Sequence, residues 1–224
     1  MKVTKRQQTW ANLDKAKVYG IADAIEALRP FASKKFDESL EIAIRLGIDI
    51  TKADQNIRGM LSLPNGTGKK VRVAVFTVNS QDEAKKAGAD VVGGEELIEA
   101  VAGGQINFDR VIATPDMMPK MSKVARVLGP KGLMPNPKLG TVTNNVAEAV
   151  KVAKAGQIEY RAEKNGIIHA SIGKLSFTTD QLVENANALI DQLKKVKPAS
   201  AKGQYILGAS VATTQGPGLR IDVK

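Results

Sequence analysis

LSLPNGTGKKVRVAVF, residues 61–76, contains the change between two strand patterns that decides the fold. Before it, apolar residues alternate with polar ones, which is typical of a strand buried on one face. After it, residues 71–78 are almost continuously apolar, which is typical of a strand buried on both faces. The glycine-rich residues 65–70 lie between the two patterns, and we interpret them as a crossing from one domain to another.

The same glycine-rich segment has some likeness to a phosphate-binding loop. Such a loop needs a glycine five residues before its Gly-Lys pair and a serine or threonine directly after it. Leu63 and Lys70 occupy these two positions. The strand would also have to precede the loop, whereas here it follows. We therefore favour the domain crossing over a nucleotide site.

The sequence before the crossing predicts a half-buried antiparallel sheet. A helical pattern formed by Ile21, Ile25 and Leu28 stops at Pro30. Residues 36–48 then alternate apolar and polar side chains, which predicts a strand. Residues 56–63 predict a neighbouring strand, and together they imply a sheet with one solvated face.

The middle of the chain alternates short buried strands with helices. Strands are expected at 71–78, 91–92 and 111–113. Helices are expected after a capping box at Ser80, over 95–102, near 120–128, and from Asn144 or Asn145 to Gly156. Strands that are buried on both sides and followed by helices predict a small parallel sheet.

One-sided alternation returns after Gly156, at residues 158–161 and 166–172. Thr178 and Gln181 have the spacing of a capping box and predict the start of a long helix. Residues 205–212 and 219–223 flank a turn rich in glycine and predict a hairpin. The two ends of the chain therefore share one pattern, and the middle has another.

We predict an α/β protein with two domains. One is a discontinuous α+β domain with an antiparallel sheet, formed by residues 1–68 plus 159–224. The other is an inserted three-layer α/β (Rossmann-like) domain with a parallel sheet, formed by residues 69–158. Two short parallel links permit bending about one axis, so we expect a hinge at Gly66, Gly68 and Gly156.

Composition narrows the function. The 224 residues include 33 basic and 23 acidic side chains, a net charge of +10, which favours a polyanionic partner such as nucleic acid. No stretch approaches the roughly 18 apolar residues of a membrane span, so we expect a cytoplasmic protein without a membrane partner. The absence of cysteine and the single histidine argue against a metal site, and no cofactor is predicted.

Catalytic patterns are weak. His169 lies in an alternating strand, where a structural histidine is the simpler interpretation. No G-x-S-x-G elbow occurs, and no G-x-G-x-x-G follows the first buried strand. Residues 129–132, GPKG, imitate the clamp of the KH module, but Pro135 and Pro137 prevent the helix that this module needs, which leaves a rigid loop with Lys131 and Lys138. An enzyme that uses the inserted domain on a phosphorylated or nucleotide substrate remains the alternative.

Two segments suit RNA contact. Phe36, at the start of a predicted strand beside Lys35, could present its ring to a base or ribose. The turn at residues 213–218 combines hydroxyl groups, an amide and glycines, so an RNA backbone can approach closely. A core position for Phe36 and an ordinary turn are the structural alternatives.

Several long segments resemble one protein family: LGIDITKADQNIRGMLSLPNGTGK (46–69), GADVVGGEELIE (88–99), ATPDMMPKMSKVARVLGPKGLMPNPKLGTVT (113–143) and TTQGPG (213–218). They are similar to large-subunit ribosomal protein one, the protein of the mobile stalk beside the tRNA exit site. The resemblance covers nearly the whole chain. It implies the discontinuous two-domain architecture and binding of the split domain to large-subunit rRNA. It also implies that the stalk assists release of deacylated tRNA from the exit site, and that bacterial members repress translation of their own-operon mRNA.

The resemblance also implies which residues bind. The RNA-binding positions would be Lys35, Phe36, Lys174, Ser176, Thr213, Thr214, Gln215, Gly216 and Pro217, and the tRNA-facing ones Lys131 and Lys138. The family usually has methionine where this chain has Gln215. Glutamine would replace an apolar contact with hydrogen bonds at that position.

Overall fold

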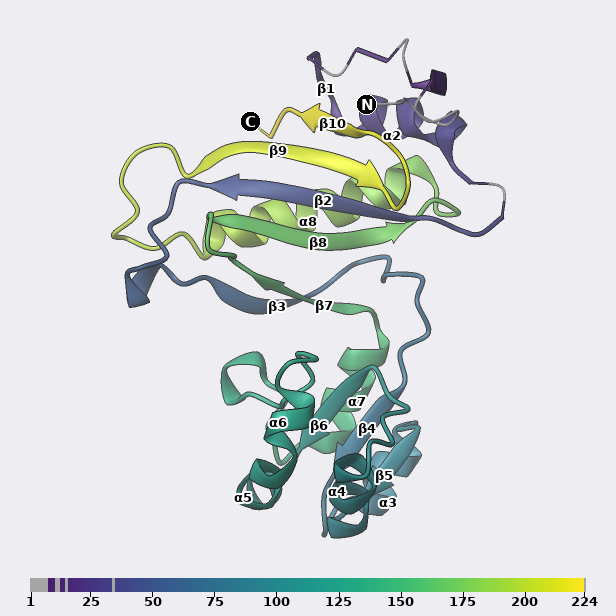
Figure 1. The fold of residues 1–224 in the computed structure, drawn as a ribbon, viewed down its shortest axis with the longest axis vertical. Helices are drawn as coiled ribbons and strands as arrows, with labels where there is room; N and C mark the ends of the chain where they lie inside the picture. The colour runs from purple at the N-terminus through teal and green to yellow at the C-terminus, as the bar shows by residue number, and fades with distance from the viewer. Residues whose placement is uncertain (1–7, 11–12, 15, 34, 224) are drawn as a thin grey trace. The chain divides into compact units, whose positions relative to one another are not determined.

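The computed structural model of the chain describes residues 8–10, 13–14, 16–33 and 35–223. The chain divides into two compact units (Figure 1). Unit 1 consists of residues 1–68 and 158–224, and unit 2 consists of residues 69–157. No helix of the described residues is both long enough and apolar enough to cross a membrane.

Unit 1 is built on a five-stranded sheet with the order β1-β10-β9-β2-β8. Its strands are β1 (Val18–Tyr19), β2 (Ser39–Leu46), β8 (Ile167–Lys174), β9 (Ile206–Thr213) and β10 (Gly218–Ile221). The interior strand β2 is antiparallel to both β8 and β9, while β1 pairs in parallel with β10. Leu40, Ile42, Ile44 and Leu46 of β2 are buried, and Glu41 and Arg45 between them are exposed. The predicted half-buried antiparallel sheet is confirmed.

Two helices provide the other layer of unit 1. They are α2 (Ile21–Leu28), which continues into η1 (Arg29–Phe31), and α8 (Thr179–Lys195), which runs behind β2 and β8 in Figure 1. Their buried side chains form one core with the inward-facing residues of the sheet. The capping box predicted at the start of α8 is present, because Thr178 and Gln181 each accept a hydrogen bond from the other's backbone N–H. The helices therefore pack on one face of the sheet.

The strand predicted at residues 56–63 has a different partner from the one expected. It forms β3 (Arg58–Ser62), after the short η2 (Ala53–Gln55), and pairs with β7 (Gln157–Arg161) in a separate two-stranded sheet. The prediction that it neighbours β2 is wrong, because β8 and β9 occupy both edges of β2. Gly59 is needed for the observed pairing, since a Cβ there would lie 2.4 Å from the Tyr160 hydroxyl oxygen.

Unit 2 contains a parallel sheet with the order β5-β4-β6. Its strands are β4 (Val73–Phe76), β5 (Val91–Gly93) and β6 (Arg110–Ala113), and its helices include α3 (Gln81–Lys86), α4 (Glu95–Ala102) and α7 (Val146–Lys154). One core contains side chains of α4, and a second contains side chains of α3 and α7. Because the two cores contain alternate residues of β4, the helices cover both faces. The predicted three-layer α/β arrangement is confirmed.

Two details of unit 2 differ from the prediction. Ser80 precedes α3, but its side chain makes no capping hydrogen bond. The helix predicted near 120–128 is broken into η3 (Pro115–Met117), α5 (Met118–Met121), η4 (Ser122–Val124) and α6 (Ala125–Leu128), followed by the separate η5 (Pro137–Leu139). Pro115 and Pro119 remove backbone donors within this series, which favours short turns over one helix. By contrast, Asn145 caps α7 as expected, accepting from the backbone N–H of Glu148.

Two carboxylates hold the start of β4 in unit 2. Asp90 accepts a hydrogen bond from the backbone N–H of Val73 at 2.9 Å, and Asp109 accepts one from that of Arg72 at 3.2 Å. These backbone hydrogen bonds are the main cause of the lowered pKa of each carboxyl group, and Lys154 contributes at Asp90. Both groups are ionised in the folded state at neutral pH.

We expect unit 2 to lose stability in acid for this reason. A carboxyl group whose folded pKa lies below its unfolded value stabilises the fold above the unfolded pKa, about 4, and this stabilisation is lost as the pH falls through the folded pKa. Denaturant unfolding of the wild type and of Asp90→Asn from pH 7 to pH 3 measures it. The variant should show a weaker pH dependence, and the exposed Asp116→Asn should match the wild type; equal dependence in all three would refute the assignment.

Candidate nucleic-acid interface

Three strand ends meet at one end of the unit 1 sheet. Ser39 at the start of β2 pairs with Lys174 at the end of β8, and Leu40 pairs with Thr213 at the end of β9. The strands are antiparallel, so the segments that precede β2, follow β8 and follow β9 lie together. We call residues 35–39, 174–177 and 213–217 the candidate edge. It brings together all nine residues predicted to bind RNA.

Asp37 and Lys174 join the first two segments of the candidate edge. The Lys174 ammonium donates to the Asp37 carbonyl at 3.1 Å and to the Ser39 hydroxyl at 2.9 Å. The Asp37 carboxylate accepts from the Ser176 hydroxyl at 2.8 Å and from the Ser176 backbone N–H at 3.2 Å. Lys174 and Ser176 therefore belong to the candidate edge and also stabilise its conformation.

Glu38 joins the first and third segments. Its side chain is only 1% exposed, and its two carboxylate oxygens accept from the backbone N–H groups of Ser33 at 2.8 Å and Gln215 at 3.2 Å. The next residue continues the connection, because the Ser39 N–H donates to the Thr214 hydroxyl at 2.9 Å and the Thr214 N–H donates to the Ser39 carbonyl at 3.1 Å. The turn after β9 is therefore held at both Thr214 and Gln215.

The candidate edge also presents groups for a ligand. Lys35 is exposed, and the Phe36 side chain is 43% exposed, an unusual position for a large apolar ring. The Thr213 hydroxyl is buried and has no hydrogen-bond partner among the described residues. It faces Gly216, where a Cβ would lie only 2.1 Å from the hydroxyl oxygen. The exposed ring and the cation suit a ribose-phosphate chain, whereas the buried Thr213 hydroxyl would have to become accessible before RNA could contact it.

The described part of the chain offers little for catalysis at this or another place. It contains no group of three or more His, Asp or Glu side chains that could hold a metal ion. His169 lies on β8 with its Nε2 atom 4.0 Å from the Glu163 carboxylate, and both side chains are more than half exposed. Among the described residues the His169 side chain makes no hydrogen bond to a hydroxyl group, so it is not joined to a nucleophile.

A model of the ribosomal protein L1p/L10e family matches residues 28–217. The chain belongs to this family. Membership makes it a ribosomal, cytoplasmic protein of the large subunit that associates with rRNA, and it fits a structural rather than an enzymatic role. The matched range includes all three segments of the candidate edge of this L1p/L10e family member.

Two residues that hold the candidate edge together were not predicted from the sequence of this L1p/L10e family member. The Arg29 guanidinium donates to the Leu175 carbonyl at 3.0 Å and to the Phe177 carbonyl at 2.7 Å, and Glu38 makes the contacts given above. The sequence did contain a signal for Glu38. It lies two residues before Leu40 and four before Ile42, so its side chain falls on the buried side of the alternating pattern. A carboxylate at a buried position needs hydrogen-bond donors. No comparable pattern marks Arg29.

The predicted hinge glycines all have positive φ angles: 67° for Gly66, 68° for Gly68 and 92° for Gly156. Gly66 belongs to unit 1, since its carbonyl accepts from the buried side-chain amide of Asn185 at 3.0 Å. Gly68 lies beside the candidate edge, because a Cβ there would be 2.9 Å from Lys174. The hinge itself stays a prediction.

The two lysines predicted to face tRNA belong to unit 2. Lys131 and Lys138 are exposed on the loop that follows α6. The loop is ordered by Asn136, whose backbone N–H donates to the Thr141 hydroxyl at 2.8 Å and whose side chain accepts from the Lys138 N–H at 2.9 Å.

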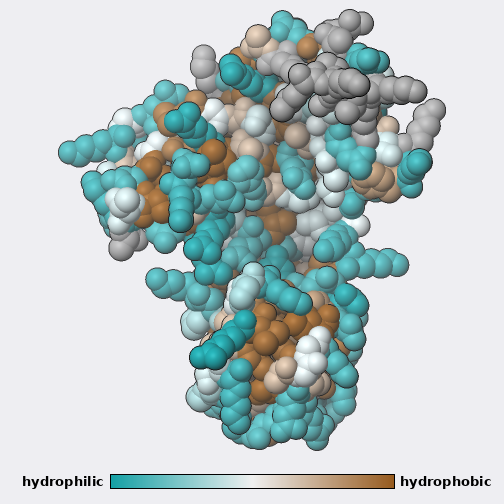
Figure 2. Space-filling model, viewed as in Figure 1, coloured by the Kyte–Doolittle hydropathy of each residue, from teal (hydrophilic) through white to brown (hydrophobic). Residues whose placement is uncertain are grey.

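On the displayed face of unit 2, hydrophobic side chains gather within a hydrophilic rim (Figure 2).

Proposed function

We propose that the candidate edge of unit 1 is the surface that binds large-subunit rRNA at the mobile stalk. The convergence of three segments carries this proposal. Strand β2 begins where β8 and β9 end, and hydrogen bonds accepted by Asp37, Glu38 and Thr214 fix the three segments, which include an exposed ring. An edge that is already ordered loses little conformational entropy when it binds, which favours recognition of a folded RNA by shape.

Replacement of Phe36 by alanine tests the proposal. Stacking of a base or ribose on an aromatic ring contributes about 1–3 kcal/mol, so affinity for a stalk rRNA fragment should fall roughly tenfold or more. Val196→Ala removes another exposed apolar side chain, 37% exposed and just after α8, and should leave affinity unchanged. Filter binding with both variants measures the effect. Equal affinity of Phe36→Ala and Val196→Ala would exclude stacking at this position.

Thr213→Val is an independent test at the turn. Because the buried hydroxyl has no described partner in the free protein, valine should leave the free energy of unfolding unchanged or raise it by about 1 kcal/mol. If the hydroxyl bonds to RNA, the same variant should bind the rRNA fragment about tenfold more weakly. Thermal unfolding and filter binding together separate the two effects. A variant with lower stability and unchanged affinity would assign the hydroxyl to the fold.

The second part of the proposal is that unit 2 contacts the tRNA in the exit site. Through this contact the stalk assists release of deacylated tRNA. Residues 117–147 contain no acidic side chain, and Lys123, Arg126, Lys131 and Lys138 of this segment are all exposed. Glu95 of α4 pairs with Lys120 of this segment, which leaves the other four cations to give the surface a net positive charge that attracts phosphates. Lys131→Ala with Lys138→Ala should reduce cross-linking of ribosome-bound tRNA to unit 2 without changing rRNA affinity. Unchanged cross-linking would remove these residues from the proposal.

The third part is repression of the protein's own mRNA. A single ordered edge can bind rRNA or an mRNA that imitates it, but not both at once. The own-operon mRNA and the rRNA fragment should therefore compete, and Phe36→Ala should weaken both complexes by the same factor. Simultaneous binding of both RNAs would refute a shared site.

A further inference from the structure

One face of the unit 1 sheet is not covered by any described helix. Helices α2 and α8 pack on the other face, against the buried side chains of β2, β8, β9 and β10. On the open face, outward-pointing residues alternate with these buried ones. The open face extends from the candidate edge to the opposite ends of β2 and β9.

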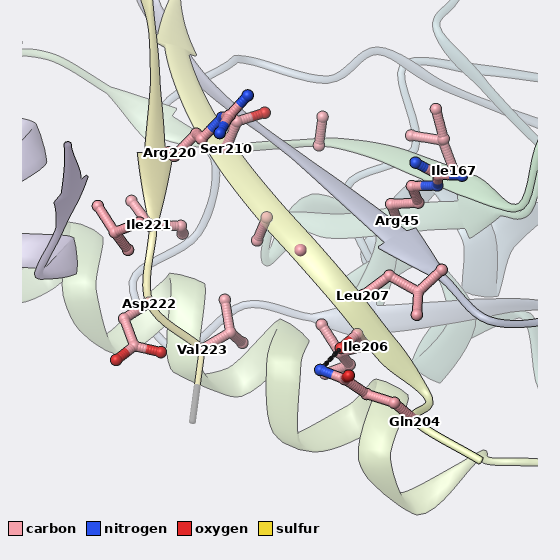
Figure 3. A pocket seen from close by; sticks show the side chains of 14 residues that line it. Arg45, Ile167, Gln204, Ile206, Leu207, Ser210, Arg220, Ile221, Asp222 and Val223 are labelled. Atoms are coloured by element: carbon pink, nitrogen blue, oxygen red, sulfur yellow. Dashed lines mark hydrogen bonds between the residues drawn. The ribbon is translucent and has the colours of Figure 1, made fainter. Parts of the chain in front are cut away.

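A hollow of about 670 Å³ lies at that opposite end (Figure 3). Its lining includes the small residues Ala43, Gly208 and Ser210; Ala43 of β2 pairs with Ser210 of β9, and Gly208 of β9 pairs with Arg45. A Cβ added at Gly208 would meet no atom within 4 Å, so the space beside its backbone is open. Leu207, 48% exposed, forms part of the rim. A ligand can therefore approach the backbone of β9 closely.

Two arginines stand on opposite sides of this hollow. Arg220 of β10 lies beside Ser210, and Arg45 projects from β2 on the other side of β9 (Figure 3). Both side chains are exposed, and neither guanidinium group makes a hydrogen bond or ion pair with another described residue. Asp222, the acidic residue in the lining, is already engaged in another interaction. The two guanidinium groups are thus available to an anionic partner.

The spacing of the two arginines is compatible with two phosphates of one nucleic acid. Arg220 pairs with Ser210, and Arg45 pairs with Gly208, two residues away along β9. Two interstrand spacings and this offset place their Cα atoms about 12 Å apart. Each guanidinium can therefore contact a different phosphate of the same backbone. No aromatic residue is among the described residues that line the hollow, and rings of this kind are what single-stranded bases stack on.

We propose that this hollow receives the sugar-phosphate backbone of a double-helical part of the same stalk rRNA. The inference rests on the proposed function of the candidate edge. Arg45 and Arg220 bind two phosphates, and Ser210 with the open backbone at Gly208 contacts ribose 2′-hydroxyls. The distance from Ser39 to Arg45, six residue steps along β2, is about 20 Å, which one RNA helix covers while its end rests on the candidate edge.

The experiment uses the full chain and a stalk rRNA fragment that contains the helix. Each lost phosphate contact should reduce the slope of log affinity against log salt by about 0.7–0.9, so Arg45→Gln with Arg220→Gln should reduce it by about 1.4–1.8. The double variant should also bind about tenfold more weakly at 0.15 M salt. Gly208→Leu should weaken binding by filling the hollow while leaving the charge unchanged.

Two controls are available. Arg161→Gln removes an exposed arginine at the end of β7 and should keep the wild-type salt slope. Circular dichroism should show that all the variants keep the fold. Hydroxyl-radical footprinting should show that the face variants lose protection in the RNA helix and keep the protection given by the candidate edge.

The outcomes separate this inference from the proposed function. If the face variants keep wild-type affinity, slope and footprint while Phe36→Ala binds weakly, the hollow does not bind RNA and the proposed function stands. If the lost protection lies in a single-stranded loop, the assignment to a helix is wrong. If the wild-type protein binds stalk rRNA no better than an unrelated RNA, both proposals fail.

Discussion

Replacement of Asn185 by alanine is expected to lower the free energy of unfolding of unit 1 by about 3 kcal/mol. The side chain is fully buried on α8 and uses both its N–H groups and its oxygen. It donates to the Ile172 carbonyl at 2.7 Å and to the Gly66 carbonyl at 3.0 Å, and it accepts from the Asn65 N–H at 3.1 Å. Alanine leaves these three groups without their partner, and each unsatisfied buried group costs about 1–3 kcal/mol.

Asn187→Ala is the matched control, because Asn187 is exposed on the same helix two residues later. It should change stability by less than about 0.5 kcal/mol. Urea unfolding of both variants measures the difference, and hydrogen exchange at Gly66 should become faster only in Asn185→Ala. Equal stability of the two variants would show that the Asn185 hydrogen bonds contribute no net stabilisation.

Among the residues that do not contact RNA in this proposal, Glu38 is expected to affect RNA binding most. We consider its replacement by glutamine. The amide group keeps one acceptor oxygen and turns an NH₂ group toward one of the two N–H donors, Ser33 or Gln215. Loss of a charged buried hydrogen bond costs about 1.5–3 kcal/mol. We expect stability to fall by about 2 kcal/mol and rRNA affinity to fall at least tenfold, since the turn is no longer held beside Phe36.

Glu26→Gln removes the same charge from the exposed face of α2 and controls for the change in net charge. It should bind rRNA as tightly as the wild type or slightly more tightly. Filter binding at several salt concentrations separates the two effects, because a charge effect fades with salt and the loss of an ordered turn does not. Equal affinities of the two glutamine variants would contradict a positioning role for Glu38.

The sequence was sufficient to predict the two kinds of sheet because their signals are local. One-sided alternation in residues 36–48 and continuous apolar character in residues 71–78 each depend on a few neighbouring residues, and the structure confirms both. Strand partners are not local. Residues 56–63 pair with β7 rather than β2, since the competition for the edges of β2 is decided by segments more than 100 residues away.

For the candidate edge, the residues themselves could be named from the sequence, but the contacts that order them could not. The family resemblance named the residues at the ends of β8 and β9, and Phe36 followed from its place beside Lys35 at the start of a strand. The hydrogen bonds that order the edge were not predictable from spacing. Arg29 reaches Leu175 and Phe177 only because α2 and α8 pack on the same face of the sheet. Its role depends on tertiary packing that no pattern in the sequence records.

The order of strands in unit 1 also has a consequence during synthesis on the ribosome. Strand β2, which lies between β9 and β8 in the sheet, emerges before unit 2, whereas β8 and β9 emerge only after all of unit 2 has been translated. Unit 2 can therefore fold while translation continues, whereas the nascent β2 must wait for partners. The turn between β9 and β10 is translated after β2, unit 2 and β8, so the proposed RNA-binding edge is complete only after β9 has emerged.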